Sequence, residues 1–327
     1  MSHTTTRHAR SKPSRARSER TWGFSVLNLL IAVLVLLGLG LVTYPTAAGW
    51  VSQYNQSNIL SGQTLATSQQ AKAELERQLK EARGYNDALQ SGALLEPGAN
   101  VAQGIGSTDA GLDYWKVLDA EPSHIMSRLR MPAIDLDLPV YHGTSDDVLL
   151  KGVGHLEGTS LPVGGVGTRS VLTGHRGLAN AVMFTNLDRV KKGDTFSVEV
   201  LGEVLTYKVF KIQVVEPSES EELRAVADKD LMTLVTCTPL GINTQRILIT
   251  GERVTPTPQS ELDAMQDKPD VPGFPWWLVG AIVVIAVVGL WYWRAGYRVQ
   301  RAMPRKPSSS TDPEPDEHTE PEGLTAV

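Results

Sequence analysis

Residues 231–250 read LMTLVTCTPLGINTQRILIT and hold two apolar runs separated by a loop of Pro, Gly and Asn. Short apolar runs bounded by turn-forming residues predict β-strands. Cys237, the single cysteine of this 327-residue chain, lies where the first run ends. A thiol at the exit of a strand has a rigid backbone and can be reached by solvent, as a nucleophile requires. A cysteine packed in a core is the alternative, and this stretch alone leaves both open.

The same pattern spreads outward from this stretch, over residues 125–254. Apolar residues alternate with polar ones or proline over residues 134–140, which is the period of a half-buried strand. The run LTYKVFKIQVV at 205–215 predicts another strand, and glycine turns at 152–154 and 164–167 separate such runs. Many short strands joined by turns indicate a closed barrel or a sandwich. The predicted fold class is therefore mainly β.

Arg246 follows Cys237 by nine residues, at the start of the second apolar run. If the loop at 239–245 joins neighbouring strands, it returns the guanidinium to the vicinity of the thiol. A permanent cation there can lower the pKa of the thiol and stabilise an oxyanion. An ordinary arginine at a strand edge is the alternative.

A nucleophilic thiol also needs a partner that transfers protons, and histidine is the usual residue for this role. His175 lies in SVLTGHRG at 170–177, where a β-type run breaks into glycine. Gly174 and Gly177 permit a tight turn, and an imidazole there can carry protons between a thiol and an amine. His142 and His155 also lie beside glycines, so local context separates the three only weakly.

Two apolar stretches, residues 24–44 and 276–293, are long enough to cross a bilayer as helices. Basic residues precede the first and follow the second, which predicts that both termini are cytoplasmic and that the segment between the spans is extracellular. A cleaved signal peptide, with a poor cleavage site at 46–48, is the alternative for the first span. These features predict a two-span protein of the cell membrane.

The chain divides into seven predicted segments: a cytoplasmic basic tail (1–22), a transmembrane helix (23–44), an extracellular helical stalk and lid loop (45–110), a β-barrel catalytic domain (111–255), a linker (256–274), a transmembrane helix (275–293) and a cytoplasmic disordered tail (294–327). Residues 62–90 are rich in helix formers and predict a short exposed helix, whereas 91–110 predict a long loop.

Composition and spacing exclude several classes of function. The segment between the spans has more Asp and Glu than Lys and Arg, so no basic face predicts nucleic acid as a partner. His, Cys and carboxylate residues do not occur at zinc spacing, and one cysteine cannot form a thiolate cage. Walker and dinucleotide glycine motifs are absent from the sequence, so no metal or cofactor is predicted.

Together, LTGHRG at 172–177 and TLVTCTPLGINTQR at 233–246 resemble the sortase signature, in which a TLxTC strand end, a following arginine and an earlier histidine form the site. Residues 139–165 also resemble the class C, pilin-polymerising branch. The resemblance implies an eight-stranded β-barrel with an N-terminal helical and lid extension and two transmembrane helices. It further implies a cysteine transpeptidase that recognises LPxTG-type sorting signals.

On this resemblance Cys237 is the nucleophile, His175 transfers protons and Arg246 stabilises the oxyanion. The acyl group then passes to a lysine amine of another pilin subunit or to a cell-wall precursor amine. Thr236 is expected to contact the sorting signal, and Asn243 to shape the loop.

A lid is expected at Glu96 and Pro97, where the family usually has Asp-Pro-aromatic, and residues 113–115 (DYW) are a weaker candidate. Three alternatives stay open: a housekeeping-type sortase that anchors surface proteins to the cell wall, another cysteine enzyme of the wall, and a non-enzymatic membrane-anchored adhesin or scaffold.

Overall fold

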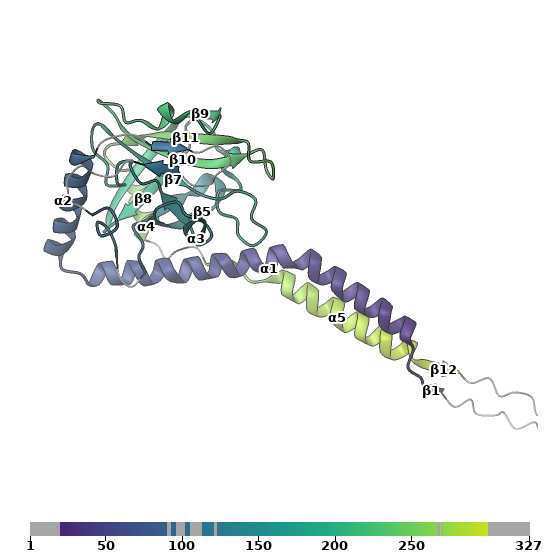
Figure 1. The fold of residues 1–327 in the computed structure, drawn as a ribbon. Coiled ribbons are helices and arrows are strands. Elements are labelled where there is room, and N and C mark those ends of the chain that lie inside the picture. Colours follow the sequence, from purple (N-terminus) through teal and green to yellow (C-terminus); the bar gives the residue numbers. More distant parts are fainter. Residues whose placement is uncertain are drawn as a thin grey trace, which may run out of the picture. The chain divides into compact units, whose positions relative to one another are not determined.

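The structure is a computed structural model that describes residues 20–89, 93–95, 102–104, 113–120, 123–266, 269 and 271–299. The chain forms two compact units, one from residues 1–35 with 285–327 and the other from residues 36–284. The larger unit contains a closed barrel of eight strands in the order β10-β11-β9-β8-β4-β5-β6-β7 (Figure 1). The predicted eight-stranded barrel is therefore confirmed.

The barrel strands are β4 (Ser127–Met131), β5 (Leu136–His142), β6 (Val153–His155), β7 (Thr168–Thr173), β8 (Thr195–Val200), β9 (Glu203–Val215), β10 (Asp230–Thr238) and β11 (Gln245–Val254). Two neighbouring pairs are parallel, β5 with β6 and β7 with β10, and the others are antiparallel. Because β7 and β10 run in the same direction, the residues that follow them emerge at the same end of the barrel.

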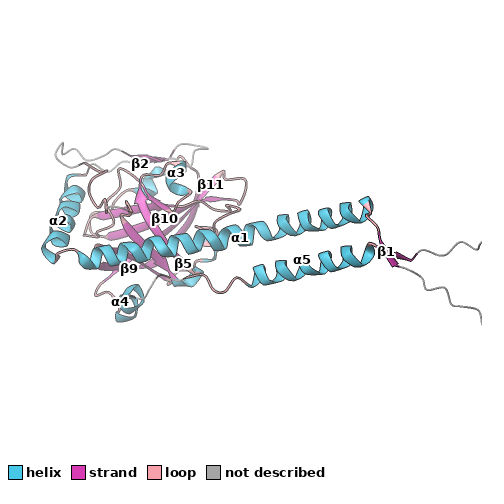
Figure 2. Cartoon of the chain, turned by 90° about the horizontal axis from the view of Figure 1, so that it is seen from below, coloured by secondary structure: helices cyan, strands magenta, loops and turns pink. Residues whose placement is uncertain are grey.

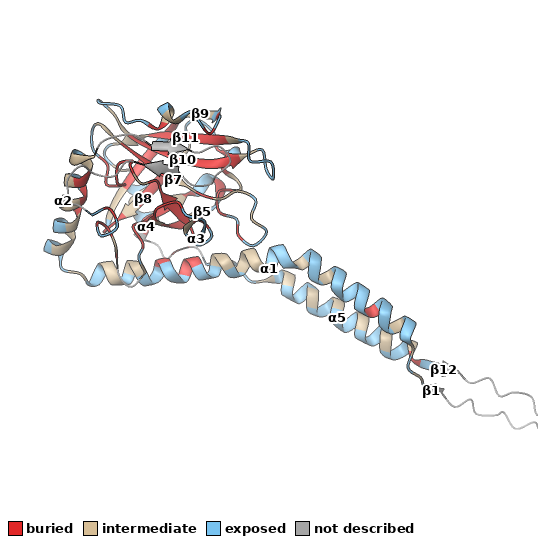
Figure 3. Cartoon of the chain, in the orientation of Figure 1, coloured by how far each residue is buried: buried red, intermediate tan, exposed pale blue. Residues whose placement is uncertain are grey.

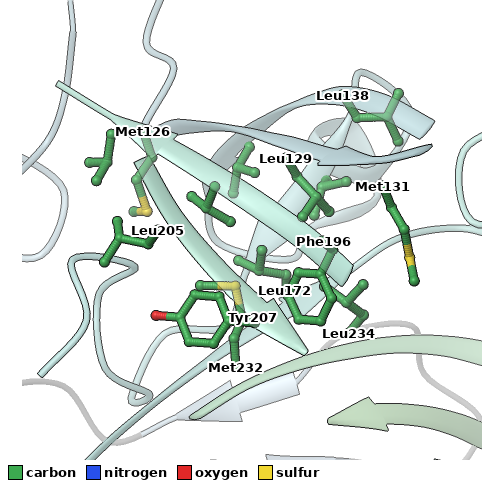
Figure 4. Close-up of a cluster of buried hydrophobic side chains, with 14 of the residues drawn as sticks. Met126, Leu129, Met131, Leu138, Leu172, Phe196, Leu205, Tyr207, Met232 and Leu234 are labelled. Atoms are coloured by element: carbon green, nitrogen blue, oxygen red, sulfur yellow. The ribbon is translucent and has the colours of Figure 1, made fainter. Parts of the chain in front are cut away.

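Apolar side chains from opposite walls fill the barrel interior. Phe196 and Tyr207 stack with ring centroids 5.6 Å apart, and Leu129, Leu172 and Leu234 pack in the same cluster (Figure 4). All five side chains are almost completely buried. Burial of a large apolar side chain contributes about 1.5–3 kcal/mol, so this cluster is the main source of the barrel's stability.

Two local details differ from the sequence pattern. The alternation over 134–140 predicts a strand from residue 134, but β5 begins at Leu136 because residues 132–134 form a 3₁₀ turn that ends in left-handed Asp135 (φ 51°). Gly154, expected in a turn, lies in β6. A Cβ there would contact the carbonyl oxygen of Gly143, so glycine is needed for the close approach of two backbone segments.

The two helices ahead of the barrel have other bounds than the expected span at 23–44 and the short helix expected over 62–90. Helix α1 runs from Val26 to Gln69, and α2 (Lys72–Ala88) begins after Ala71, whose extended backbone (φ −65°, ψ 134°) interrupts the helical path. Within the larger unit the C-terminal part of α1 runs beside the barrel (Figure 2) and buries Leu60. Helix α2 buries Leu79, Ala82 and Tyr85 in the main core cluster.

Two segments predicted as loop or linker contain regular structure. Helix α4 (Gln259–Gln266) lies in the stretch after β11, and Glu261 accepts hydrogen bonds from Thr195 (3.2 Å) and Ser197 (2.9 Å) of β8. Residues in the predicted lid loop form the antiparallel pair β2 (Ala93–Leu95) and β3 (Ala102–Gly104). Regular structure therefore occurs among the described residues of both segments.

Two helices, α1 and α5 (Trp276–Ala295), are long and apolar enough to cross a membrane. Their apolar side chains are mostly exposed, whereas those of the barrel strands are buried (Figure 3). In the smaller unit β1 (Arg20–Trp22) pairs with β12 (Tyr297–Val299), and Trp22 contacts Tyr292 edge to face. These two exposed apolar helices are consistent with membrane anchoring.

Candidate active site

Cys237 is the penultimate residue of β10, and its antiparallel partner on β11 is Arg246. Directly opposed residues of an antiparallel pair point to the same face, with Cβ atoms about 4.5–5.5 Å apart. The loop between the two strands therefore returns the guanidinium to the thiol, as the spacing of nine residues predicts. The Cys237 side chain is 8% exposed, so the sulfur is largely buried and not, as a strand exit suggests, freely open to solvent.

Backbone carbonyl groups of the loop at 239–244 and of the first residue of β11 hold the Arg246 guanidinium in place. Arg246 Nη1 donates hydrogen bonds to the carbonyls of Asn243 (2.9 Å) and Gln245 (3.0 Å). Asn243 has a left-handed backbone (φ 60°), which asparagine tolerates, and its N–H donates to the carbonyl of Pro239 (2.9 Å). This geometry agrees with the expectation that Asn243 shapes the loop, and it orients the guanidinium of Arg246, a residue that is 4% exposed.

The parallel pairing of β7 with β10 places His175 and Cys237 on neighbouring segments. The register ends with Thr173 opposite Val235, so His175 and Cys237 each lie two residues beyond the last pair. The N–H of Gly174 donates to the carbonyl of Val235 (3.1 Å). Since the pairing continues to the residue before the imidazole, His175 emerges beside Cys237. Pairing thus brings the three predicted residues to one end of the barrel.

Burial shifts the two titrating groups of this site in opposite directions. It raises the pKa of the Cys237 thiol, which the positive charge of Arg246 partly lowers. It lowers the pKa of half-buried His175, which the negative charge of Asp146, at the start of α3 (Asp146–Leu149), partly raises. Both shifts favour the uncharged pair at neutral pH, so the thiolate and the imidazolium form together only in a minor fraction of molecules.

The other two glycine-flanked histidines have structural positions. The Tyr114 hydroxyl lies 3.0 Å from His155 Nδ1 and accepts a hydrogen bond from the N–H of Gly143 (2.9 Å). Nε2 of His155 is 2.9 Å from the carbonyl of Ser160, and burial lowers the pKa of this imidazole to about 3. His142 packs edge to face on Tyr114, and burial lowers its pKa too. Burial favours the neutral form of both histidines, and both pack in the interior against Tyr114.

The remaining predicted positions divide into two groups. Glu96 and Pro97, the expected lid, lie outside the described residues. The weaker lid candidate contains Tyr114, which is buried in the histidine cluster described above. Thr236 is 1% exposed, and its hydroxyl donates to the carbonyl of Gly174 (2.7 Å). Its contact with a sorting signal stays a prediction, while the observed bond joins the strand of the thiol to the segment of the imidazole.

Sequence reasoning missed two charged neighbours of His175. Arg176 is the next residue, and its side chain is 9% exposed and contacts Thr238 at the end of β10 as well as Thr185 and Asp188. Asp146 acts on the imidazole from another part of the chain. The only sequence signal for Arg176 is its place inside LTGHRG, and no local pattern indicates that Asp146 lies nearby.

The structure thus defines the class of protein: a closed β-barrel that brings a cysteine, a histidine and an arginine together at one end, with the site built around the thiol. The sortase domain model matches residues 129–254. The crystal structure of sortase C-1 from Actinomyces oris matches with a TM-score of 0.50 and 47% sequence identity. The match covers 55% of this chain and 98% of that one. Sortase C from Streptococcus pneumoniae is 39% identical, with a TM-score of 0.55, over 62% and 98%.

Among curated proteins, Sortase D of Bacillus subtilis (strain 168) is 31% identical over 130 residues, or 39% of this chain and 63% of that protein. The chain spans less than two thirds of the length of the curated relatives it matches. The chain belongs to the sortase family, and its structural neighbours are class C sortases.

Proposed function

We propose that this protein is a membrane-anchored cysteine transpeptidase that cleaves LPxTG-like sorting signals between Thr and Gly. It then joins the acyl group to a lysine amine of another pilin subunit. The observation that carries the proposal is the pairing of Cys237 with Arg246 on neighbouring strands, with the His175 segment alongside. The pilin acceptor is supported by the likeness to class C enzymes, among them a pilus-related sortase C of Group B Streptococcus that is 36% identical.

In the first half-reaction the Cys237 thiolate attacks the Thr carbonyl carbon, and a C–S bond forms. The carbonyl oxygen becomes an oxyanion, which the Arg246 guanidinium stabilises. The His175 imidazolium donates its proton to the glycine nitrogen as the C–N bond breaks, leaving a thioester and a neutral imidazole. Burial of the thiol suits this step, because a water-poor site strengthens the attraction between the oxyanion and Arg246.

In the second half-reaction a lysine amine attacks the thioester carbonyl. His175 accepts the proton that the amine loses, and the C–S bond breaks to regenerate the thiolate and the imidazolium. The same three side chains therefore serve both halves, and no cofactor is required. The lid expected at Glu96 and Pro97 would control access to this site.

The proposed location is the outer face of the cell membrane, with both termini cytoplasmic. The two exposed apolar helices support anchoring, and the basic residues outside both spans support this orientation. In this arrangement the barrel meets sorting signals as exported proteins emerge from the membrane.

The test is mass spectrometry of the full-length protein in detergent after incubation with an LPxTG peptide. A thioacyl adduct on Cys237 is expected, and a lysine-bearing pilin peptide should release it. Cys237→Ala should form no adduct, and His175→Ala should slow formation strongly. Cleavage that persists in Cys237→Ala would refute the assignment. Release by cell-wall amines but not by pilin lysine would favour the housekeeping role.

A further inference from the structure

Arg176 connects the loop of His175 to the strand of Cys237. Its Nη1 donates to the Thr238 hydroxyl (3.1 Å), its Nη2 pairs with Asp188 (2.7 Å), and its Nε donates to the carbonyl of Thr185 (3.3 Å). The guanidinium therefore uses all three of its nitrogens. The Arg176 side chain is 9% exposed and Asp188 is 46% exposed, so the guanidinium itself is largely removed from water, and a partner that it loses there is costly.

Two side-chain hydrogen bonds join the Cys237 strand to the His175 segment, one just before the catalytic pair in the sequence and one just after it. Thr236, the residue before Cys237, donates to the carbonyl of Gly174, the residue before His175. Thr238, the residue after Cys237, accepts from Arg176, the residue after His175. Side-chain bonds thus join the two segments immediately before and immediately after the thiol and the imidazole.

The His175 loop is also closed on itself, which makes Arg176 a rigid connection. The N–H of Phe184 donates to the carbonyl of His175 (3.0 Å), and the N–H of Gly177 donates to the Thr185 hydroxyl (3.0 Å). Thr185 and Asp188, which bind the Arg176 guanidinium, come shortly after Phe184 in the chain. If this loop moved, the His175 imidazole and Arg176 would therefore move together. The bond from Arg176 to Thr238 opposes such a movement.

We propose that Arg176 is a positioning residue that sets the approach of the His175 imidazole to the Cys237 thiol, with Asp188 orienting its guanidinium. Arg176 acts through His175 and touches no reacting atom. The inference rests on the proposed function, since it assumes that the His175 imidazolium must lie beside Cys237 to protonate the departing glycine nitrogen. A planar fork with three directed donors is required, and lysine offers only a point charge on a flexible stem.

The first experiment compares Arg176→Met and Arg176→Lys with the wild-type full-length protein in detergent. We expect kcat for peptide cleavage to fall about 10- to 100-fold in both, with KM within about twofold, since a misplacement near 1 Å can cost that much. Arg83→Met is the matched control. Arg83 pairs with Glu203 (2.6 Å) beside the first residues of β7 and β10, the opposite end of the strands from the site, and this variant should keep full activity.

The second readout is the pH dependence of Cys237 alkylation by iodoacetamide, which needs no peptide substrate. Displacement of the imidazole removes a ring N–H that can donate to the thiolate even when the imidazole is neutral, so the midpoint should move to higher pH in Arg176→Met and Arg176→Lys. Thr238→Val, which removes only one acceptor, should give a smaller shift of the same sign. This milder variant keeps the test valid if the Arg176 variants do not fold.

The outcomes separate the two proposals. A wild-type profile and unchanged kcat in folded Arg176→Met would overturn the inference. A loss of activity that only follows the fraction of folded protein, with an unchanged alkylation profile, would overturn it too, because Arg176 would then be merely structural. If the wild type fails to cleave the peptide, the proposed function fails, and the alkylation profile still decides whether Arg176 positions His175.

Discussion

The buried ion pair between Arg128 of β4 and Asp137 of β5 allows a quantitative prediction. Arg128 Nε and Nη2 donate to the two carboxylate oxygens of Asp137 (2.8 and 2.6 Å), and the side chains are 5% and 9% exposed. Arg128 Nη1 also donates to the carbonyl of Met265 in α4 (3.1 Å) and lies 3.9 Å from the Glu199 carboxylate. One guanidinium thus holds two carboxylates and a helix carbonyl.

Arg128→Met keeps most of the side-chain volume but leaves the carboxylates of Asp137 (9% exposed) and Glu199 (18% exposed) without this cation. Removing one partner of a buried pair costs about 3–5 kcal/mol. For a folded unit of this size, 1 kcal/mol corresponds to about 2–4 °C in Tm, so we expect a decrease of about 6–20 °C. Tryptophan fluorescence of the full-length protein in detergent measures this transition.

The sign of the pH dependence tests the reasoning further. Burial already raises the pKa of Glu199, and the Arg128 charge lowers it. Without Arg128 the pKa of Glu199 rises further, so protonation of Glu199 restores part of the stability as the pH falls. The deficit in Tm should therefore be smaller at pH 5 than at pH 8. The control is Arg77→Met, whose Tm should match that of the wild type, since Arg77 is exposed on α2 and solvent screens its pairs with Glu74 and Glu81. A Tm of Arg128→Met within 2 °C of the wild type at pH 8 would refute this account.

Three further predictions follow from the site and from α1. Arg246→Gln should shift the alkylation midpoint of Cys237 to higher pH, because the Arg246 charge lowers the pKa of this buried thiol; an unchanged midpoint would contradict the pairing. Thr236→Val should lose about 1 kcal/mol of stability in urea unfolding, while Thr236→Ser, which keeps the hydroxyl bond to Gly174, should lose clearly less; equal losses would argue against that bond. Leu60→Ala should lose about 2–5 kcal/mol because Leu60 is 1% exposed, whereas Leu65→Ala on the same helix, at 60% exposure, should be nearly neutral; similar effects would mean that α1 does not pack on the barrel as described.

Local sequence pattern determined the strands, the two apolar helices and the importance of the 231–250 stretch. Period-two alternation and turn residues are properties of neighbouring positions, so they can be read without knowing the partners of a strand. The antiparallel return of Arg246 to Cys237 also follows from a short loop. These features were therefore predictable.

Tertiary structure alone decided the rest, because strand pairing and burial depend on residues far apart in the chain. Three histidines have glycine neighbours, but the parallel pairing of β7 with β10 brings only His175 beside the thiol, whereas the other two pack on Tyr114. The burial of Cys237 and the bond from Arg176 to Thr238 arise from the same long-range contact. The sequence thus specified which residue types can react, and the closure of the barrel decided which of them meet.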